Sequence, residues 1–240
     1  MERPLDVARA ALSDVIAAIL ARGLGAVALV ELAMSTQADA KFIIESASRL
    51  SGIAKLAAIS FGLGDGANEA IKDCGDLIHD YSWVQAARGF QDGTLMIGVV
   101  RLCILLDADP KTVSFQGVYH RLKNPDVQRA LIERVYGEHE AFQAIFGSSP
   151  KEMVAQFLEI YREIDWGIHS RLIHFRNYGV AHLLDRKNWK SITYDEMRGL
   201  ISLVGRLGDK LIELCHIPLP PIDHTTEEYT AWGKKALLKK

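Results

Sequence analysis

The chain has few cysteines and no arrangement of residues that marks a metal site. Its 240 residues include three cysteines, Cys74, Cys103 and Cys215. The number is odd, no pair has the C-x-x-C spacing, and each thiol lies in an apolar run. We therefore expect free, buried thiols in a reducing compartment such as the cytoplasm. No cluster of side chains has the spacing of zinc ligands, so we expect no metal.

A long uninterrupted apolar run and a strong net charge are also missing. The apolar residues 15–33 contain Arg22, end near Glu31 and are divided by Gly23 and Gly25. A central arginine is costly in a bilayer, which favours a buried element of a soluble protein and no membrane contact. Early acidic residues and the lack of a small-residue cleavage site argue against a signal peptide. The formal net charge of -2 excludes an overall basic, nucleic-acid-binding character.

Helix start signals and apolar spacings predict an all-α chain. Ser149–Glu152 is a capping box with Pro150 at the first helical position. Apolar residues then repeat every three or four positions as far as Phe175, which predicts one long amphipathic helix. A second capping box, Thr193–Glu196, predicts a helix with an apolar stripe from Leu200 to Leu214, which the following prolines end.

Further helices are predicted upstream. They cover residues 71–107 as one or two helices, 113–122, 125–136, and runs near 5–21 and 37–60. The stretch from Gly25 to Met34 fits either a helix or a strand.

These signals divide the chain into three parts: an N-terminal helical extension of unknown role (1–65), a helical bundle (66–222) and a polar C-terminal tail or terminal helix (223–240). Gly62, Gly64 and Gly66 predict a linker near the first boundary. They are not a phosphate loop, because no Lys-Ser/Thr pair follows them at the required spacing.

The most informative segment is Arg176-Asn177-Tyr178-Gly179-Val180-Ala181-His182. On an ideal helix, Arg176 and His182 lie about 120° apart and can line one cleft without touching. The imidazole can take a proton from a ribose hydroxyl, the amide can orient it, and the guanidinium can hold the phosphate. The same residues also fit an ordinary helix end, so the surrounding sequence decides between these interpretations.

That surrounding sequence is basic and aromatic. Residues 169–190 contain five cations and one acid, a local net charge of +4 in a chain that is negative overall. A basic cluster with interleaved aromatic residues is typical of a phosphate-backbone ligand, and the alternative is a solvated charged face. The candidate RNA contacts are Arg171, His174, Tyr178, Arg186, Lys187 and Lys190.

The motif resembles the Arg-Asn…His signature of HEPN domains, the higher-eukaryote-and-prokaryote nucleotide-binding helical bundles. Other stretches resemble the AbiU-type abortive-infection branch of that superfamily, over about residues 70–220. In chain order they are Tyr81–Ala86, Val100–Leu102, Leu106–Asp107, Asp109–Phe115, Leu122–Val127, Phe175–Asn177 and Ala181–Asp185. Tyr178 departs from the pattern, since a lysine is expected there.

The resemblance implies an up-and-down HEPN-like bundle of four to five core helices with additional N-terminal helices. It implies a homodimer in which two Arg-Asn…His motifs face a shared cleft, and a metal-independent endoribonuclease with no cofactor. His182 would be the general base or acid, and Arg176 would stabilise the phosphorane. Asn177 would be a positioning residue. From their spacing near a helix end, Arg101 and Asp107 fit either a structural ion pair, which we favour, or a role in supporting the cleft, and Asp185 is a further candidate for that support.

Catalytic members of this superfamily are often toxins or antiviral defence proteins. The resemblance therefore implies RNA as the substrate, a 2′,3′-cyclic phosphate and a 5′-hydroxyl as products, and a cognate antitoxin as a candidate partner. The main alternative is a non-catalytic module of the same fold that binds nucleotides or a partner protein. A purely structural helical protein, in which the motif is only a helix end, is the third interpretation.

Overall fold

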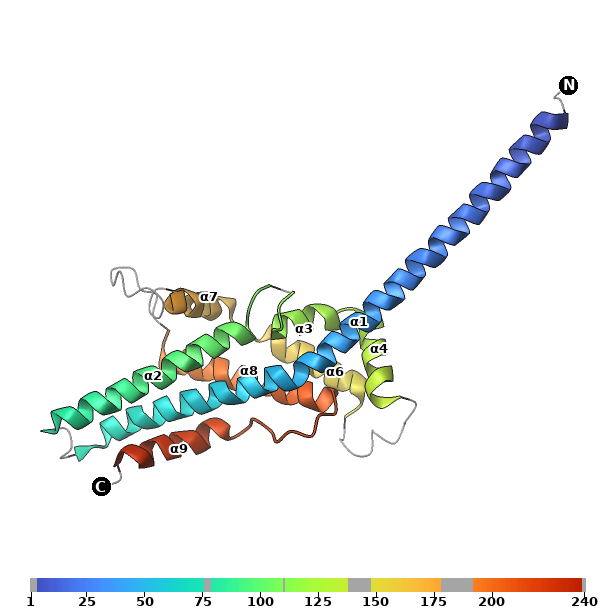
Figure 1. The fold of residues 1–240 in the computed structure, drawn as a ribbon. Helices are drawn as coiled ribbons and strands as arrows, with labels where there is room; N and C mark the ends of the chain where they lie inside the picture. The colour runs from blue at the N-terminus through green and yellow to red at the C-terminus, as the bar shows by residue number, and fades with distance from the viewer. Residues whose placement is uncertain (1–3, 76–78, 110, 138–147, 178–191, 239–240) are drawn as a thin grey trace.

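The structure, a computed structural model, describes residues 4–75, 79–109, 111–137, 148–177 and 192–238, with side chains from residue 34 onward. These residues form eight helices and no strand, which confirms the all-α prediction (Figure 1). The helices are α1 (Pro4–Lys72), α2 (Tyr81–Leu105), α3 (Phe115–Leu122), α4 (Pro125–Tyr136), α6 (Pro150–Arg162), α7 (Trp166–Phe175), α8 (Tyr194–Leu214) and α9 (Thr225–Leu238).

Helix α1 is the axis of the bundle. It is one continuous helix of 69 residues, so the strand alternative for residues 25–34 is wrong. Its first half extends beyond the other helices, and its second half is surrounded by α2, α8 and α9 (Figure 1). The buried residues between Ala40 and Phe61 belong to the same hydrophobic core as α2 to α8. The predicted boundary at residue 65 therefore falls inside a central helix.

Two of the three glycines predicted to form a linker, Gly62 and Gly66, instead allow α9 to lie against α1, whereas Gly64 faces α2. A Cβ atom on Gly66 would be 2.2 Å from the carbonyl oxygen of Thr230. On the opposite helix, a Cβ atom on Gly233 would be 2.7 Å from the carbonyl oxygen of Leu63, and Gly62 is equally crowded by α9. Only glycine, which has no side chain, permits such an approach of two backbones.

The C-terminal segment is therefore part of the bundle. Lys234 Nζ lies 2.6 Å from Asp73 Oδ2, just beyond the end of α1. Trp83 of α2 donates a hydrogen bond from Nε1 to the carbonyl oxygen of Leu237 (3.0 Å). The sequence predicted a polar tail, with a loose terminal helix as the alternative; the segment is helical, but it is packed on α1 and α2 and is therefore neither loose nor a tail.

The single long helix predicted between residues 150 and 175 is two helices, α6 and α7. Asp165 caps α7, because its Oδ1 accepts hydrogen bonds from the N–H groups of Gly167 (2.7 Å) and Ile168 (3.1 Å). The cap needs extended backbone at Asp165 (φ -76°, ψ 101°), which is incompatible with a continuous helix. The apolar spacing continues through the break because both helices pack against one core.

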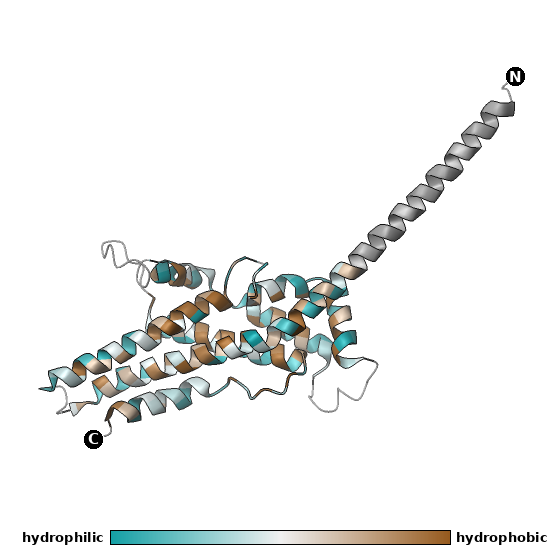
Figure 2. Ribbon diagram, viewed as in Figure 1, coloured by the Kyte–Doolittle hydropathy of each residue, from teal (hydrophilic) through white to brown (hydrophobic). Residues whose placement is uncertain are grey.

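Several other predictions are confirmed. Both capping boxes are formed, at the starts of α6 and α8, and α4 has the predicted bounds. The three cysteines are buried and unpaired. Apolar residues gather where the helices face one another (Figure 2). In the part of the chain that the structure describes, no helix combines the length and apolar character needed to cross a membrane.

The approach of α9 to α1 predicts opposite effects for two glycine substitutions. Gly66→Ala should destabilise the protein by about 1–3 kcal/mol, because the new methyl group collides with α9. The control, Gly52→Ala, should stabilise it by up to about 1 kcal/mol, because Gly52 lies in the same helix and its new methyl group would have no atom within 4 Å. Urea unfolding followed by circular dichroism measures both changes, and equal effects would contradict the role of Gly66.

Candidate functional site

The Arg176–Asn177 pair of the predicted catalytic motif lies directly after α7. Asn177 Oδ1 accepts hydrogen bonds from two nitrogens of Arg176, Nε (3.0 Å) and Nη2 (2.8 Å). Both side chains are half-buried. Two bonds to one oxygen fix the plane of the guanidinium, so Asn177 holds the cation in a defined orientation at the end of the helix.

Charges and burial together set the protonation of the groups around Arg176. Burial raises the pKa of the Cys103 thiol to about 11 and lowers the pKa of His169 below its ordinary value. The positive charge of Arg176 lowers both pKa values, whereas the negative charge of Asp107 raises both. At neutral pH the thiol is therefore protonated and the imidazole is uncharged. The end of α2 and the end of α7 are therefore close enough that their charges act on the same two groups, Cys103 and His169; we call these residues the Arg176 neighbourhood.

His169 is the member of this neighbourhood that sequence reasoning missed. It is only 7% exposed, and its Nε2 has no hydrogen-bond partner among the described residues. The ring stands edge-on to Trp166, with 5.2 Å between the centroids. A buried polar atom without a partner costs about 1–3 kcal/mol. In the sequence, His169 is only one histidine of the basic cluster, because its burial results from the packing of α7 against α2.

Arg171, predicted to contact RNA, forms an ion pair with Glu196. Glu196 also closes the capping box of α8, so this ion pair ties α7 to the start of α8. The pair neutralises one cation of the basic cluster. His174 is half-buried in the last turn of α7, and its predicted contact with RNA stays a prediction, like that of Arg171.

Arg101 and Asp107 do not form the ion pair that their spacing allowed. Arg101 Nη1 donates hydrogen bonds to the carbonyl oxygen of Leu56 (2.7 Å) and to Ser60 Oγ, both in α1. Arg101 therefore stabilises the packing of α2 on α1, and its role in supporting the cleft stays a prediction. Asp107 Oδ1 accepts a hydrogen bond from the N–H of Asp109 (3.0 Å), and its charge acts on the same two groups as Arg176.

The remaining predicted site residues lie outside the part of the chain that the structure describes. They are Tyr178, His182, Asp185, Arg186, Lys187 and Lys190.

A small cavity adjoins the Arg176 segment. It has a volume of about 140 Å³ and lies between α2, the end of α7 and the start of α8. Phe175, the residue before Arg176, forms part of its wall. The other lining residues are Asp92, Leu95, Met96, Val99, Ile192, Thr193, Tyr194 and Met197. Most of the wall is apolar, and a few polar groups stand at its edge.

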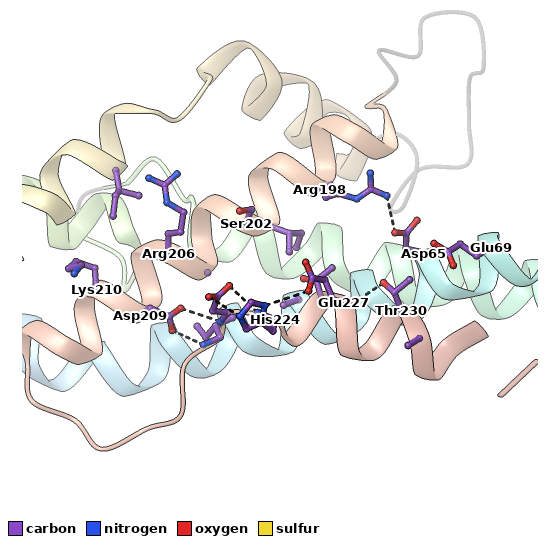
Figure 3. Close-up of a pocket in the computed structure, with 18 of the residues that line it drawn as sticks. Asp65, Glu69, Arg198, Ser202, Arg206, Asp209, Lys210, His224, Glu227 and Thr230 are labelled. Carbon is purple, nitrogen blue, oxygen red and sulfur yellow. Dashed lines mark hydrogen bonds and ion pairs between the residues drawn. The ribbon is translucent and has the colours of Figure 1, made fainter. Parts of the chain in front are cut away.

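A larger groove of about 1110 Å³ lies between α1, α8 and α9, away from the predicted site (Figure 3). Its charged side chains are largely satisfied within the protein. Arg198 lies 2.9 Å from Asp65, and Asp209 Oδ1 accepts a hydrogen bond from the N–H of Ile222 (2.7 Å). His224 lies between Asp223 and Glu227. This groove is held together by internal ion pairs, and no predicted site residue lines it.

Among the described residues, no group of three or more His, Cys, Asp or Glu side chains is arranged to hold a metal ion. Comparisons of the chain with models of protein families, with curated proteins and with solved structures found no match. The resemblance to HEPN domains therefore depends on the residues quoted above.

The opposing charges around His169 predict opposite changes in its pKa. Arg176→Ala removes a positive charge that disfavours the imidazolium, so the pKa of His169 should rise. Asp107→Asn removes a negative charge that favours the imidazolium, so the pKa should fall. NMR titration of the imidazole protons measures both shifts. Arg206→Ala, in the distant groove, is the control and should leave the pKa unchanged, and shifts of the same sign in all three variants would contradict this description.

Proposed function

We propose that this protein is a metal-independent endoribonuclease of a microbial toxin or antiviral abortive-infection system. The observation that carries the proposal is the Arg176 guanidinium, held in orientation by Asn177 directly before the segment that contains His182. A fixed, permanently charged fork is suited to two oxygens of a phosphate group. The similarity of this segment to the Arg-Asn…His signature supplies the second support.

The proposed reaction needs no nucleophile from the protein. His182 takes the proton of a ribose 2′-hydroxyl, and the 2′-oxygen forms a bond to the adjacent phosphorus. Arg176 stabilises the extra negative charge of the phosphorane. The bond from phosphorus to the 5′-oxygen then breaks, and that oxygen takes up a proton. The products are a 2′,3′-cyclic phosphate and a 5′-hydroxyl, and the protein contributes positioning and electrostatics.

The surroundings of Arg176 favour this chemistry. Its neighbours Cys103 and His169 are buried and uncharged at neutral pH. Interactions between charges are stronger in such a poorly solvated setting than in water. In this setting the half-buried Arg176 would interact strongly with a bound phosphate group.

Cleavage of RNA in the presence of EDTA tests the function. The wild-type protein should produce cyclic-phosphate ends, and Arg176→Ala and His182→Ala should each lower the rate by at least about 100-fold. Arg129→Ala is the control, because Arg129 is an exposed arginine of α4 that lies outside the predicted site, and it should cleave like the wild type. Equal rates for the wild type and His182→Ala would contradict the proposal. Cleavage by none of the proteins would favour the non-catalytic binding module.

We further propose that the protein is a homodimer and that α2 provides the contact. Phe90, Ile97 and Ile104 are spaced seven residues apart on α2 and are 39%, 47% and 46% exposed. Val100, at 37%, lies between them on the same face. The C-terminal half of α2 is strongly apolar (Figure 2). A seven-residue spacing is typical of a seam between two helices, and a second copy offers the same row.

Substitution on this face of α2 tests the dimer. Ile97→Glu should convert the protein from dimer to monomer, because it places a charge in the centre of the apolar seam. Leu219→Glu is the matched control, since Leu219 is 41% exposed but lies between α8 and α9, and it should remain dimeric. Light scattering coupled to gel filtration measures the mass. A monomeric wild-type protein would contradict the proposed contact.

A further inference from the structure

The cavity beside Arg176 has the size of one six-membered ring. Its volume is about 140 Å³. An apolar protein cavity of about 150 Å³ is known to accommodate benzene. A pyrimidine base is a single six-membered ring, whereas the two fused rings of a purine need more room. The volume therefore fits the single ring of a pyrimidine more closely than the two rings of a purine.

The wall of the cavity is suited to a flat ring. Phe175 and Tyr194 contribute aromatic side chains from the end of α7 and the start of α8, and Met96 and Met197 contribute flexible thioethers. Unstacked bases of single-stranded RNA bind to proteins by contact with aromatic side chains. Methionine adapts its shape and makes favourable contacts with ring edges. Both features match an unstacked base better than an aliphatic ligand.

The polar groups at the edge of the cavity distinguish between the two pyrimidines. Asp92 supplies a carboxylate, and carboxylates accept hydrogen bonds from the exocyclic amino group of cytosine. Uracil has a carbonyl oxygen at that position, which a carboxylate repels, and it offers only its single ring N–H as a donor. The hydroxyl oxygen of Tyr194 accepts a hydrogen bond from Gln91 Nε2, which leaves the hydroxyl proton to donate to a ring carbonyl. The lining therefore includes an acceptor, Asp92, and a donor, the Tyr194 hydroxyl.

We propose that this cavity binds a cytosine base of single-stranded RNA, next to the phosphate group that Arg176 holds. Phe175 lines the cavity and Arg176 follows it in the chain, so the base and the phosphate belong to the same or to adjacent nucleotides. The inference deepens the proposed ribonuclease function and rests on it for the identity of the polymer. It assigns the sequence preference to residues of α2, α7 and α8.

Binding of uncleavable oligonucleotides by the full-length protein tests this inference. The probes are fluorescein-labelled 2′-O-methyl oligocytidine and 2′-O-methyl oligouridine, which have no free 2′-hydroxyl and cannot react. Fluorescence anisotropy should give an affinity for oligocytidine about tenfold higher than for oligouridine. Asp92→Asn should abolish or reverse this preference, because an amide can donate to the uracil oxygen. Asp126→Asn, an exposed acid of α4, is the control and should retain the preference.

A second variant tests the cavity independently of its polar edge. Met96→Trp should fill the space and weaken binding of both oligonucleotides, and circular dichroism checks that the variant is folded. Equal affinities for the two probes, or no binding of either, would overturn the inference. Cleavage of RNA without a cytosine preference would leave the ribonuclease function intact and refute the base site. A cytosine preference that depends on Asp92 in a protein that cleaves no RNA would support the base site and refute the ribonuclease function.

Discussion

The direct contact of helix backbones along α1 is the constraint on which the remaining structure depends. Ser51 Oγ of α1 donates a hydrogen bond to the carbonyl oxygen of Gly208 in α8 (2.9 Å), and a Cβ atom on Gly208 would be 3.5 Å from the Cα atom of Ser51. Gly66 makes a still closer approach to α9. Contacts of this kind tolerate little sliding, so α1 fixes the register of α8.

The start of α8 then fixes Glu196, which binds Arg171 and thereby positions α7. The orientation of the Arg176 segment therefore depends on α1, a helix that lies outside the predicted site.

The electrostatics of the site follow from this placement. Arg176 and Asp107 act in opposite directions on the same two buried groups, Cys103 and His169. Because His169 is desolvated and close to a permanent cation, a second positive charge there would be costly, and the imidazole stays neutral. Among the residues that the structure describes, Arg176 is therefore a cation in a fixed orientation, held by Asn177, and the proposed function assigns it to a phosphate group. A single oriented guanidinium distinguishes a phosphorane from a ground-state phosphate better than scattered lysines do, since its hydrogen bonds are directional.

Structural features that depend on local signals, such as helix starts, could be predicted from the sequence, whereas contacts between distant segments could not. Capping boxes act over three residues, so the starts of α6 and α8 were predictable. The Asp165 cap is equally local, but the apolar spacing continued through it and concealed the break. The glycines around Gly66 predicted a linker because their contact with α9 involves a segment about 160 residues later in the chain, which no local signal reveals. The Arg-Asn pair was identified from its chemistry. The ion pair of Arg171 and the burial of His169 depend on tertiary packing, which no spacing in the sequence encodes.

Helix α2 carries the proposed dimer contact and also lines the cavity because two of its faces point in different directions. The apolar row around Ile97 faces outward, and Met96 and Val99 line the cavity, whereas Arg101 borders the outward row, about 40° from Ile97, and its side chain reaches α1. At 100° per residue, the centre of the outward row and the centre of the cavity wall lie about 120° apart around the helix axis. A second copy seated on the outward row would therefore leave the cavity beside Arg176 open. The proposed dimer contact and the proposed base site are thus compatible on one helix, and substitutions that disrupt one should spare the other.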